Sequence, residues 1–128
     1  MARELRELKV LIVDDSIAVG ERVAAMLSEL PGVTVVWNAQ NVSEAREVLQ
    51  TFRPDAALLD IRLPDGSGIE LLRELKAANP DTTTIMLTGF SPTVYADACR
   101  KAGADYFVNK AYGFEEIPDL FRRLVGTN

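Results

Sequence analysis

The residues of this sequence best suited to chemistry are three aspartates and one lysine, each at the end of an apolar run. Asp14 and Asp15 follow Val-Leu-Ile-Val, Asp60 follows Ala-Ala-Leu-Leu, and Lys110 follows Tyr-Phe-Val-Asn. If these runs are strands of one parallel sheet, their carboxyl ends lie at one edge, where such folds bind ligands. Clustered carboxylates repel unless a cation neutralises them, and oxygen ligands without His or thiolate suit a hard ion such as Mg²⁺. The four side chains therefore predict a site for a metal ion and a phosphate group.

The elements that would position these side chains follow a regular pattern along the chain. Short apolar runs alternate with amphipathic segments, which is typical of an α/β fold with a parallel sheet. Ser16 is expected to cap the first helix with Ile17 on its inward face, and Pro118 is tolerable only in the first turn of the last helix. We expect strands at 9–13, 33–38, 56–59, 84–87 and 106–108, and helices at about 17–30, 43–52, 69–78, 92–102 and 115–125.

Composition limits the possible classes of protein. The 128 residues are 48% hydrophobic and 26% charged, which predicts one globular domain over residues 1–128. The net charge of -5 without a basic cluster argues against direct binding of nucleic acid. The absence of His excludes His-based zinc sites and Ser-His or Cys-His catalysis, and the single Cys99 excludes an internal disulfide. No signal peptide or long apolar stretch is present, so we expect a cytoplasmic protein without membrane insertion.

Four motifs, taken together, resemble a known family over essentially the whole chain. They are Val-Asp-Asp-Ser at 13–16, Leu-Leu-Asp-Ile-Arg-Leu-Pro-Asp-Gly at 58–66, Met-Leu-Thr-Gly at 86–89, and Gly-Ala-Asp-Tyr-Phe-Val-Asn-Lys at 103–110. Their order and spacing are similar to those of the receiver domain of two-component response regulators. The resemblance implies a flavodoxin-like, doubly wound sandwich with five parallel strands in the order 2-1-3-4-5. It also implies a receiver of the single-domain type, although a receiver cut from a longer regulator remains an alternative.

The resemblance further implies a role for each matching residue. Asp60 would accept a phosphoryl group from the phosphohistidine of a sensor histidine kinase or a phosphotransfer protein. A surface formed by the fourth helix, fifth strand and fifth helix would then switch to control a downstream protein, and the same surface could form a homodimer. The domain would assist only its own phosphorylation and dephosphorylation, so it is not an enzyme. The ion would be Mg²⁺, for which Mn²⁺ could substitute, held by Asp14, Asp15, Asp60 and the backbone carbonyl of Arg62. The residues that bind the phosphate or take part in the switch would be Thr88, Lys110 and Phe107. The residues that tune access to the phosphate would be Arg62, Gly89 and Phe90.

Other functions and purely structural explanations remain open at this point. A receiver-like docking module that works without phosphorylation would have no need of the intact aspartates. A phosphohydrolase of the haloacid dehalogenase type would place a second Asp where Arg62 stands. Taken singly, the acidic pair could cap a helix, Asp60 and Thr88 could form turns, Lys110 could be a surface charge, and Phe107 could be core.

The sequence departs from the family pattern after the lysine. Receivers usually have Pro there, in a cis bond, whereas this chain has Ala111. A cis bond before a residue other than proline costs roughly 2.5–4 kcal/mol. We therefore predict a trans Lys110–Ala111 bond, with Tyr112 and Gly113 leading the chain into the last helix.

Overall fold

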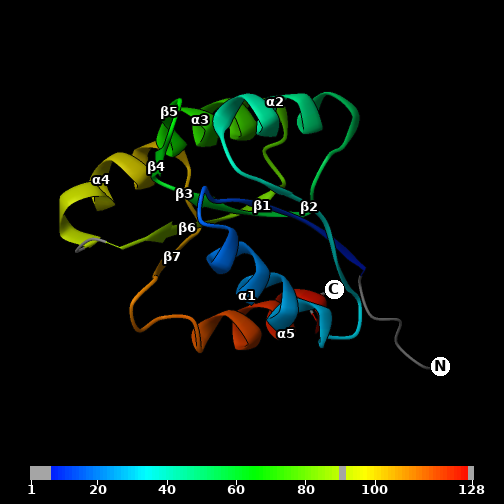
Figure 1. The fold of residues 1–128 in the computed structure, drawn as a ribbon. Coiled ribbons are helices and arrows are strands. Elements are labelled where there is room, and N and C mark those ends of the chain that lie inside the picture. Colours follow the sequence, from blue (N-terminus) through cyan, green and yellow to red (C-terminus); the bar gives the residue numbers. More distant parts are fainter. Residues whose placement is uncertain (1–6, 90–91, 127–128) are drawn as a thin grey trace.

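The computed structural model describes residues 7–89 and 92–126, and within them five parallel strands form one sheet in the order β2-β1-β3-β6-β7 (Figure 1). These strands are β1 (Leu8–Val13), β2 (Val33–Ala39), β3 (Ala56–Asp60), β6 (Thr83–Thr88) and β7 (Tyr106–Asn109). Helices α1 (Ile17–Ser28) and α5 (Glu116–Gly126) cover one face of the sheet, and α2 (Val42–Thr51), α3 (Gly68–Ala78) and α4 (Pro92–Ala102) cover the other. The predicted flavodoxin-like fold is confirmed. None of the described helices is long and apolar enough to cross a membrane.

The hydrophobic core forms two layers, one on each face of the sheet. Ile12 of β1 packs in the layer beneath α1 and α5, whereas its neighbour Leu11 packs in the layer beneath α2, α3 and α4. Successive strand residues point to opposite faces, so β1 is buried on both sides and needs apolar residues at nearly every position. Because β1 is fixed in this way between β2 and β3, the aspartates that follow it are held at a defined place on the sheet edge.

Most predicted element ends are within two residues of the observed ones. The Ser16 hydroxyl accepts a hydrogen bond from Val19 N at 3.2 Å and caps α1 as predicted. Pro118 is the third residue of α5, inside the first turn. The inward position expected for Ile17 is wrong, because its side chain is 56% exposed. Ile17 is the first residue of α1, and the helix meets the core only from Val19 and Gly20 onward.

A short antiparallel hairpin between β3 and α3 was not predicted. Its strands β4 (Arg62–Leu63) and β5 (Gly66–Ser67) are too short for any periodic pattern to reveal them. The turn between them carries Asp65, whose carboxylate accepts hydrogen bonds from Val42 N at 2.7 Å and Ser43 N at 3.0 Å. The hairpin is therefore fastened to the start of α2, and the chain that follows Asp60 has a defined path.

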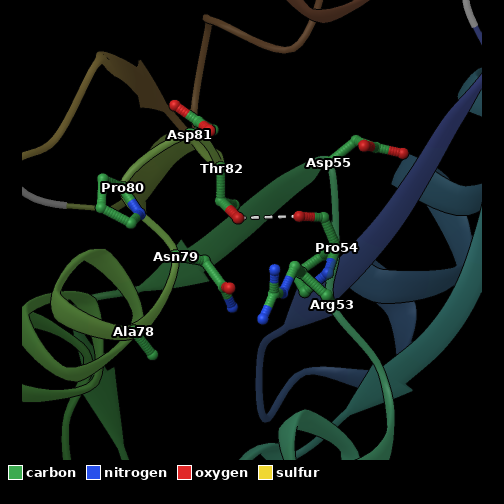
Figure 2. A pocket seen from close by; sticks show the side chains of 8 residues that line it. All are labelled: Arg53, Pro54, Asp55, Ala78, Asn79, Pro80, Asp81 and Thr82. Atoms are coloured by element: carbon green, nitrogen blue, oxygen red, sulfur yellow. Dashed lines mark hydrogen bonds between the residues drawn. The ribbon is translucent and has the colours of Figure 1, made fainter.

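A pocket of about 330 Å³ lies at the amino-terminal ends of the strands (Figure 2). It is lined by Arg53, Pro54, Asp55, Ala78, Asn79, Pro80, Asp81 and Thr82. Figure 2 shows the Thr82 hydroxyl donating to the carbonyl oxygen of Pro54, at 2.7 Å. These two residues precede β3 and β6, whereas Asp60 is the last residue of β3. The pocket therefore lies at the amino ends of the strands, away from the predicted site, and we assign it no ligand.

Candidate functional site

The strand ends bring together the polar residues singled out from the sequence. Asp14 follows β1, Asp60 ends β3, Thr88 ends β6 and Lys110 follows β7. Backbone hydrogen bonds fix two of them, from Asp14 N to the oxygen of Ala39 at 2.9 Å and from Lys110 N to the oxygen of Thr88 at 2.8 Å. Since all these strands are parallel, their carboxyl ends share one edge. The side chains thus converge although almost a hundred residues separate the first from the last.

Lys110 is the centre of this arrangement. Its ammonium nitrogen lies 2.6 Å from Asp14 Oδ2 and 2.9 Å from Asp60 Oδ2. Asp14 is fully buried, and its other oxygen accepts a hydrogen bond from Ser16 N at 2.8 Å. A buried carboxylate is costly unless it is paired and hydrogen-bonded. Lys110 and Ser16 therefore provide the buried Asp14 carboxyl group with an ion-pair partner and a hydrogen bond, and Asp14 in turn holds Lys110 beside Asp60.

The surroundings shift the pKa of both Asp60 and Lys110. Burial raises the pKa of the Asp60 carboxyl above its ordinary value, Lys110 opposes this, and the charge of Asp14 adds to it. Burial lowers the pKa of the Lys110 ammonium, but hydrogen bonds and charge attraction to Asp14 and Asp60 outweigh burial, so the pKa is raised overall. Lys110 therefore stays positively charged at neutral pH. The carboxylates keep an excess of negative charge that a further cation would neutralise.

The remaining oxygens suit a hard cation. Asp14, Asp15 and Asp60 each offer a carboxylate oxygen, and these oxygens lie within 4.8 Å of one another. Lys110 contacts Oδ2 of both Asp14 and Asp60, whereas Asp15 is exposed and Asp60 Oδ1 lies 3.4 Å from Arg62 N, a long contact. The carboxylate of Asp15 and Oδ1 of Asp60 are thus better placed than Asp14 to bind a cation. An all-oxygen set of this kind favours Mg²⁺ or Mn²⁺ over zinc or copper.

Residues predicted to surround the phosphate occupy different environments. Thr88 is buried at the end of β6, Phe107 is half-buried in β7, and Gly89 is exposed. A Cβ atom added to Gly89 would have no atom of the described residues within 4 Å, so the space beside Gly89 is open. Phe90 lies outside the described residues.

Arg62 begins β4, two residues after Asp60, and its Nη2 donates to the hydroxyl of Tyr95 at 3.1 Å. Sequence reasoning missed Tyr95, because a contact across 33 residues leaves no local pattern.

The loop after Lys110 confirms the predicted trans bond. No cis peptide bond occurs among the described residues. Asn109 Oδ1 accepts a hydrogen bond from Ala111 N at 2.7 Å, and Gly113 N donates to the Asn109 oxygen at 2.7 Å. A Cβ atom on Gly113 would lie 2.8 Å from the backbone nitrogen and oxygen of Asn109, so only glycine fits without displacement. The chain turns tightly here, and Lys110 keeps its place in the acidic cluster.

Comparison with known proteins agrees with this geometry. Residues 10–122 match the response regulator receiver domain family. The DNA-binding transcriptional activator DevR/DosR of Mycobacterium tuberculosis is 38% identical over 109 residues, covering 84% of this chain and 50% of that protein. A protein-glutamate methylesterase/protein-glutamine glutaminase of Syntrophomonas wolfei is 40% identical over 106 residues, covering 83% of this chain and 30% of that protein.

Solved structures give the same result. A CheY-like response regulator receiver domain protein from Methanospirillum hungatei superposes with a TM-score of 0.81 at 27% identity, covering 93% of this chain and 94% of that one. This chain spans about half the length of several curated relatives that it matches. It belongs to the response regulator receiver domain family, the phosphorylated signalling domains of two-component systems.

Proposed function

We propose that Asp60 accepts a phosphoryl group from the phosphohistidine of a sensor histidine kinase or phosphotransfer protein, and that residues 1–128 act as one receiver domain. The observation that carries this proposal is the Lys110 ammonium held between Asp14 and Asp60, at 2.6 and 2.9 Å. An ammonium in that position can pair with a phosphoryl oxygen as soon as one is attached to Asp60. A docking module that works without phosphorylation would not need a buried carboxylate to hold it there.

The chemistry requires no general base. A carboxylate oxygen of Asp60 attacks phosphorus, the new P–O bond forms as the P–N bond of the donor breaks, and the electron pair goes to the donor imidazole. Thr88, at the end of β6, would donate its hydroxyl to the transferred group, and open space beside Gly89 leaves room for it. The same groups would position water for hydrolysis of the acyl phosphate. The domain would thus act on its own phosphoryl group and on no external substrate.

Asp15 and Asp60 would bind Mg²⁺ or Mn²⁺ directly, with the backbone carbonyl of Arg62 as a further ligand. Asp14 would contribute mainly by holding Lys110, since one of its oxygens contacts that ammonium and the other accepts from Ser16 N. When bound, the ion neutralises charge that gathers on the phosphoryl oxygens.

Phosphorylation would draw Thr88 toward the phosphate and let Phe107 turn inward, which alters the surface formed by α4, β7 and α5. That surface would bind the downstream partner or a second copy of the domain. Which activity it controls would depend on that partner.

The test is phosphorylation by acetyl phosphate in the presence of Mg²⁺, followed by intact mass measurement. Wild type should gain one phosphoryl group, and Asp60→Asn none. Asp81→Asn is the matched control, because Asp81 is an exposed aspartate at the opposite edge of the sheet and should leave the gain intact. A phosphoryl group that persists in Asp60→Asn would contradict the assignment.

A further inference from the structure

Arg62 connects the candidate phosphorylation site directly to helix α4. Its guanidinium donates to the Tyr95 hydroxyl at 3.1 Å, and its backbone nitrogen lies 3.4 Å from Asp60 Oδ1. Arg62 pairs with Ser67 in the β4–β5 hairpin, so its backbone is fixed. The Tyr95 ring is half-buried against the core layer beneath α3 and α4. This hydrogen bond thus joins a hairpin that starts two residues after Asp60 to the helix expected to carry the output.

We propose that Arg62 exchanges partners on phosphorylation. Its guanidinium leaves the Tyr95 hydroxyl and binds the phosphoryl group on Asp60, which releases α4 from β4. This inference rests on the proposed function of Asp60. It adds a connection between the site and α4 that is separate from Thr88 and Phe107.

Charge determines the direction of this exchange. The phenol of Tyr95 is a neutral acceptor, whereas a phosphoryl group brings a charge of about −1.5 to −2. A guanidinium binds such a group through paired N–H donors, and charge-assisted hydrogen bonds are roughly twice as strong as neutral ones. The Arg62 side chain starts within a few ångströms of Asp60 and is exposed, so a change of rotamer brings the head group to the new acceptor without moving the hairpin.

Thermodynamic linkage gives the exchange a measurable consequence. A hydrogen bond that exists only in the unphosphorylated state opposes activation, so its removal must favour the activated state by the same free energy. Tyr95→Phe keeps the packed ring and deletes only the hydroxyl. It should therefore tighten the binding of beryllofluoride, a phosphoryl analogue, about 2- to 5-fold, which is within the range of an ordinary hydrogen bond.

The experiment is a double-mutant cycle on beryllofluoride affinity, measured by calorimetry at saturating Mg²⁺. Arg62→Met should weaken binding, because the phosphoryl analogue loses a partner. Tyr95→Phe should then have no further effect in the Arg62→Met background. Tyr112→Phe is the matched control, since this ring is 77% exposed and its hydroxyl takes part in none of the hydrogen bonds found among the described residues. Hydrogen exchange over residues 96–102 should be faster in unliganded Tyr95→Phe than in unliganded wild type, and equal once beryllofluoride is bound.

The outcomes separate this inference from the proposed function. Unchanged affinity in Tyr95→Phe, while wild type binds beryllofluoride normally, overturns the partner exchange and leaves the proposed function intact. An equal gain from Tyr95→Phe with and without Arg62 also overturns it, because the hydroxyl would then act through another group. If wild type fails to bind beryllofluoride with Mg²⁺, both proposals fail.

Discussion

Replacing Lys110 by Met tests the electrostatic basis of the site, because it removes the cation that faces two carboxylates. At an effective dielectric constant of about 20, a unit charge pair at the observed 2.6 Å to Asp14 gains roughly 6 kcal/mol, and the 2.9 Å contact to Asp60 gains slightly less. Dehydration of the three groups and repulsion between the carboxylates offset most of this gain. Measured losses on removing one partner of a buried pair are about 3–5 kcal/mol. Because Lys110 remains 19% exposed, we expect the lower end, about 3 kcal/mol at pH 7.

The loss in Lys110→Met should depend on pH in a defined direction. Burial already raises the pKa of Asp60 in the folded protein, and the variant lacks the ammonium that opposes this. Above the ordinary carboxyl pKa, the folded variant then binds more protons than the unfolded chain, so its stability falls as pH rises. The destabilisation relative to wild type should therefore be largest near neutral pH and smaller toward pH 4.

Urea unfolding at pH 7 and pH 5 measures both effects. Lys101→Met is the matched control, since Lys101 is an exposed lysine of α4 and its loss should change stability by less than about 0.5 kcal/mol. Equal stability of Lys110→Met and wild type at pH 7 would refute the argument. A loss of the same size at both pH values would show that Lys110 contributes by packing and not by charge.

Three further predictions address the metal site, the β4–β5 hairpin and the close approach of α3 to the backbone of Asp60. Asp15→Asn should abolish Mg²⁺ binding in a calorimetric titration while leaving the fold as stable as wild type or more so, because it removes charge from an acidic cluster; undiminished affinity would contradict this. Two backbone N–H groups of α2 lower the pKa of Asp65, so its stabilising effect should be present above the ordinary carboxyl pKa and lost as pH falls through the lowered value; Asp65→Asn should lower the melting temperature at pH 7 and lower it less as pH falls below the ordinary carboxyl pKa, and a lowering that does not change with pH would argue against the charge. Gly68→Ala would drive a Cβ atom into the backbone carbonyl oxygen of Asp60, so it should cost about 2 kcal/mol or more in urea unfolding and slow phosphorylation, whereas Gly126→Ala, with open space around it, should not.

The sequence was sufficient to predict the parallel sheet and the meeting of the site's side chains, because both follow from one rule. Strands buried on both faces read as apolar runs, and a polar residue after such a run in a parallel sheet lies at the ligand-binding edge. The rule places Asp14, Asp60 and Lys110 together without any knowledge of side-chain contacts. It does not distinguish Asp14 from Asp15, since both follow the same strand. The structure distinguishes them, because Asp14 is buried in contact with Lys110 whereas Asp15 is exposed.

What the sequence did not reveal depends on contacts without a local pattern. Strands of two residues carry no periodicity, so the β4–β5 hairpin was invisible. The hydrogen bond from Arg62 to Tyr95 depends on the rotamers of two long side chains and on how closely α4 approaches the hairpin. The exposure of Ile17 depends on where α1 begins relative to the end of the sheet. Each of these is set by tertiary structure, which overrides local propensity.

If Asp60 is phosphorylated as proposed, the charges at the carboxyl ends of the strands should make metal and phosphoryl binding depend on each other. Three carboxyl groups face one ammonium, and burial together with the charge of Asp14 raises the pKa of the Asp60 carboxyl although Lys110 opposes this. A phosphoryl group would add more negative charge to the same cluster, and Lys110 alone cannot neutralise it. A divalent cation held by Asp15 and Asp60, as proposed, would offset this negative charge. By linkage, a phosphoryl group on Asp60 would then raise the affinity for the cation by the same factor by which the cation stabilises the phosphorylated state, and a calorimetric titration of Mg²⁺ with and without beryllofluoride would measure that factor.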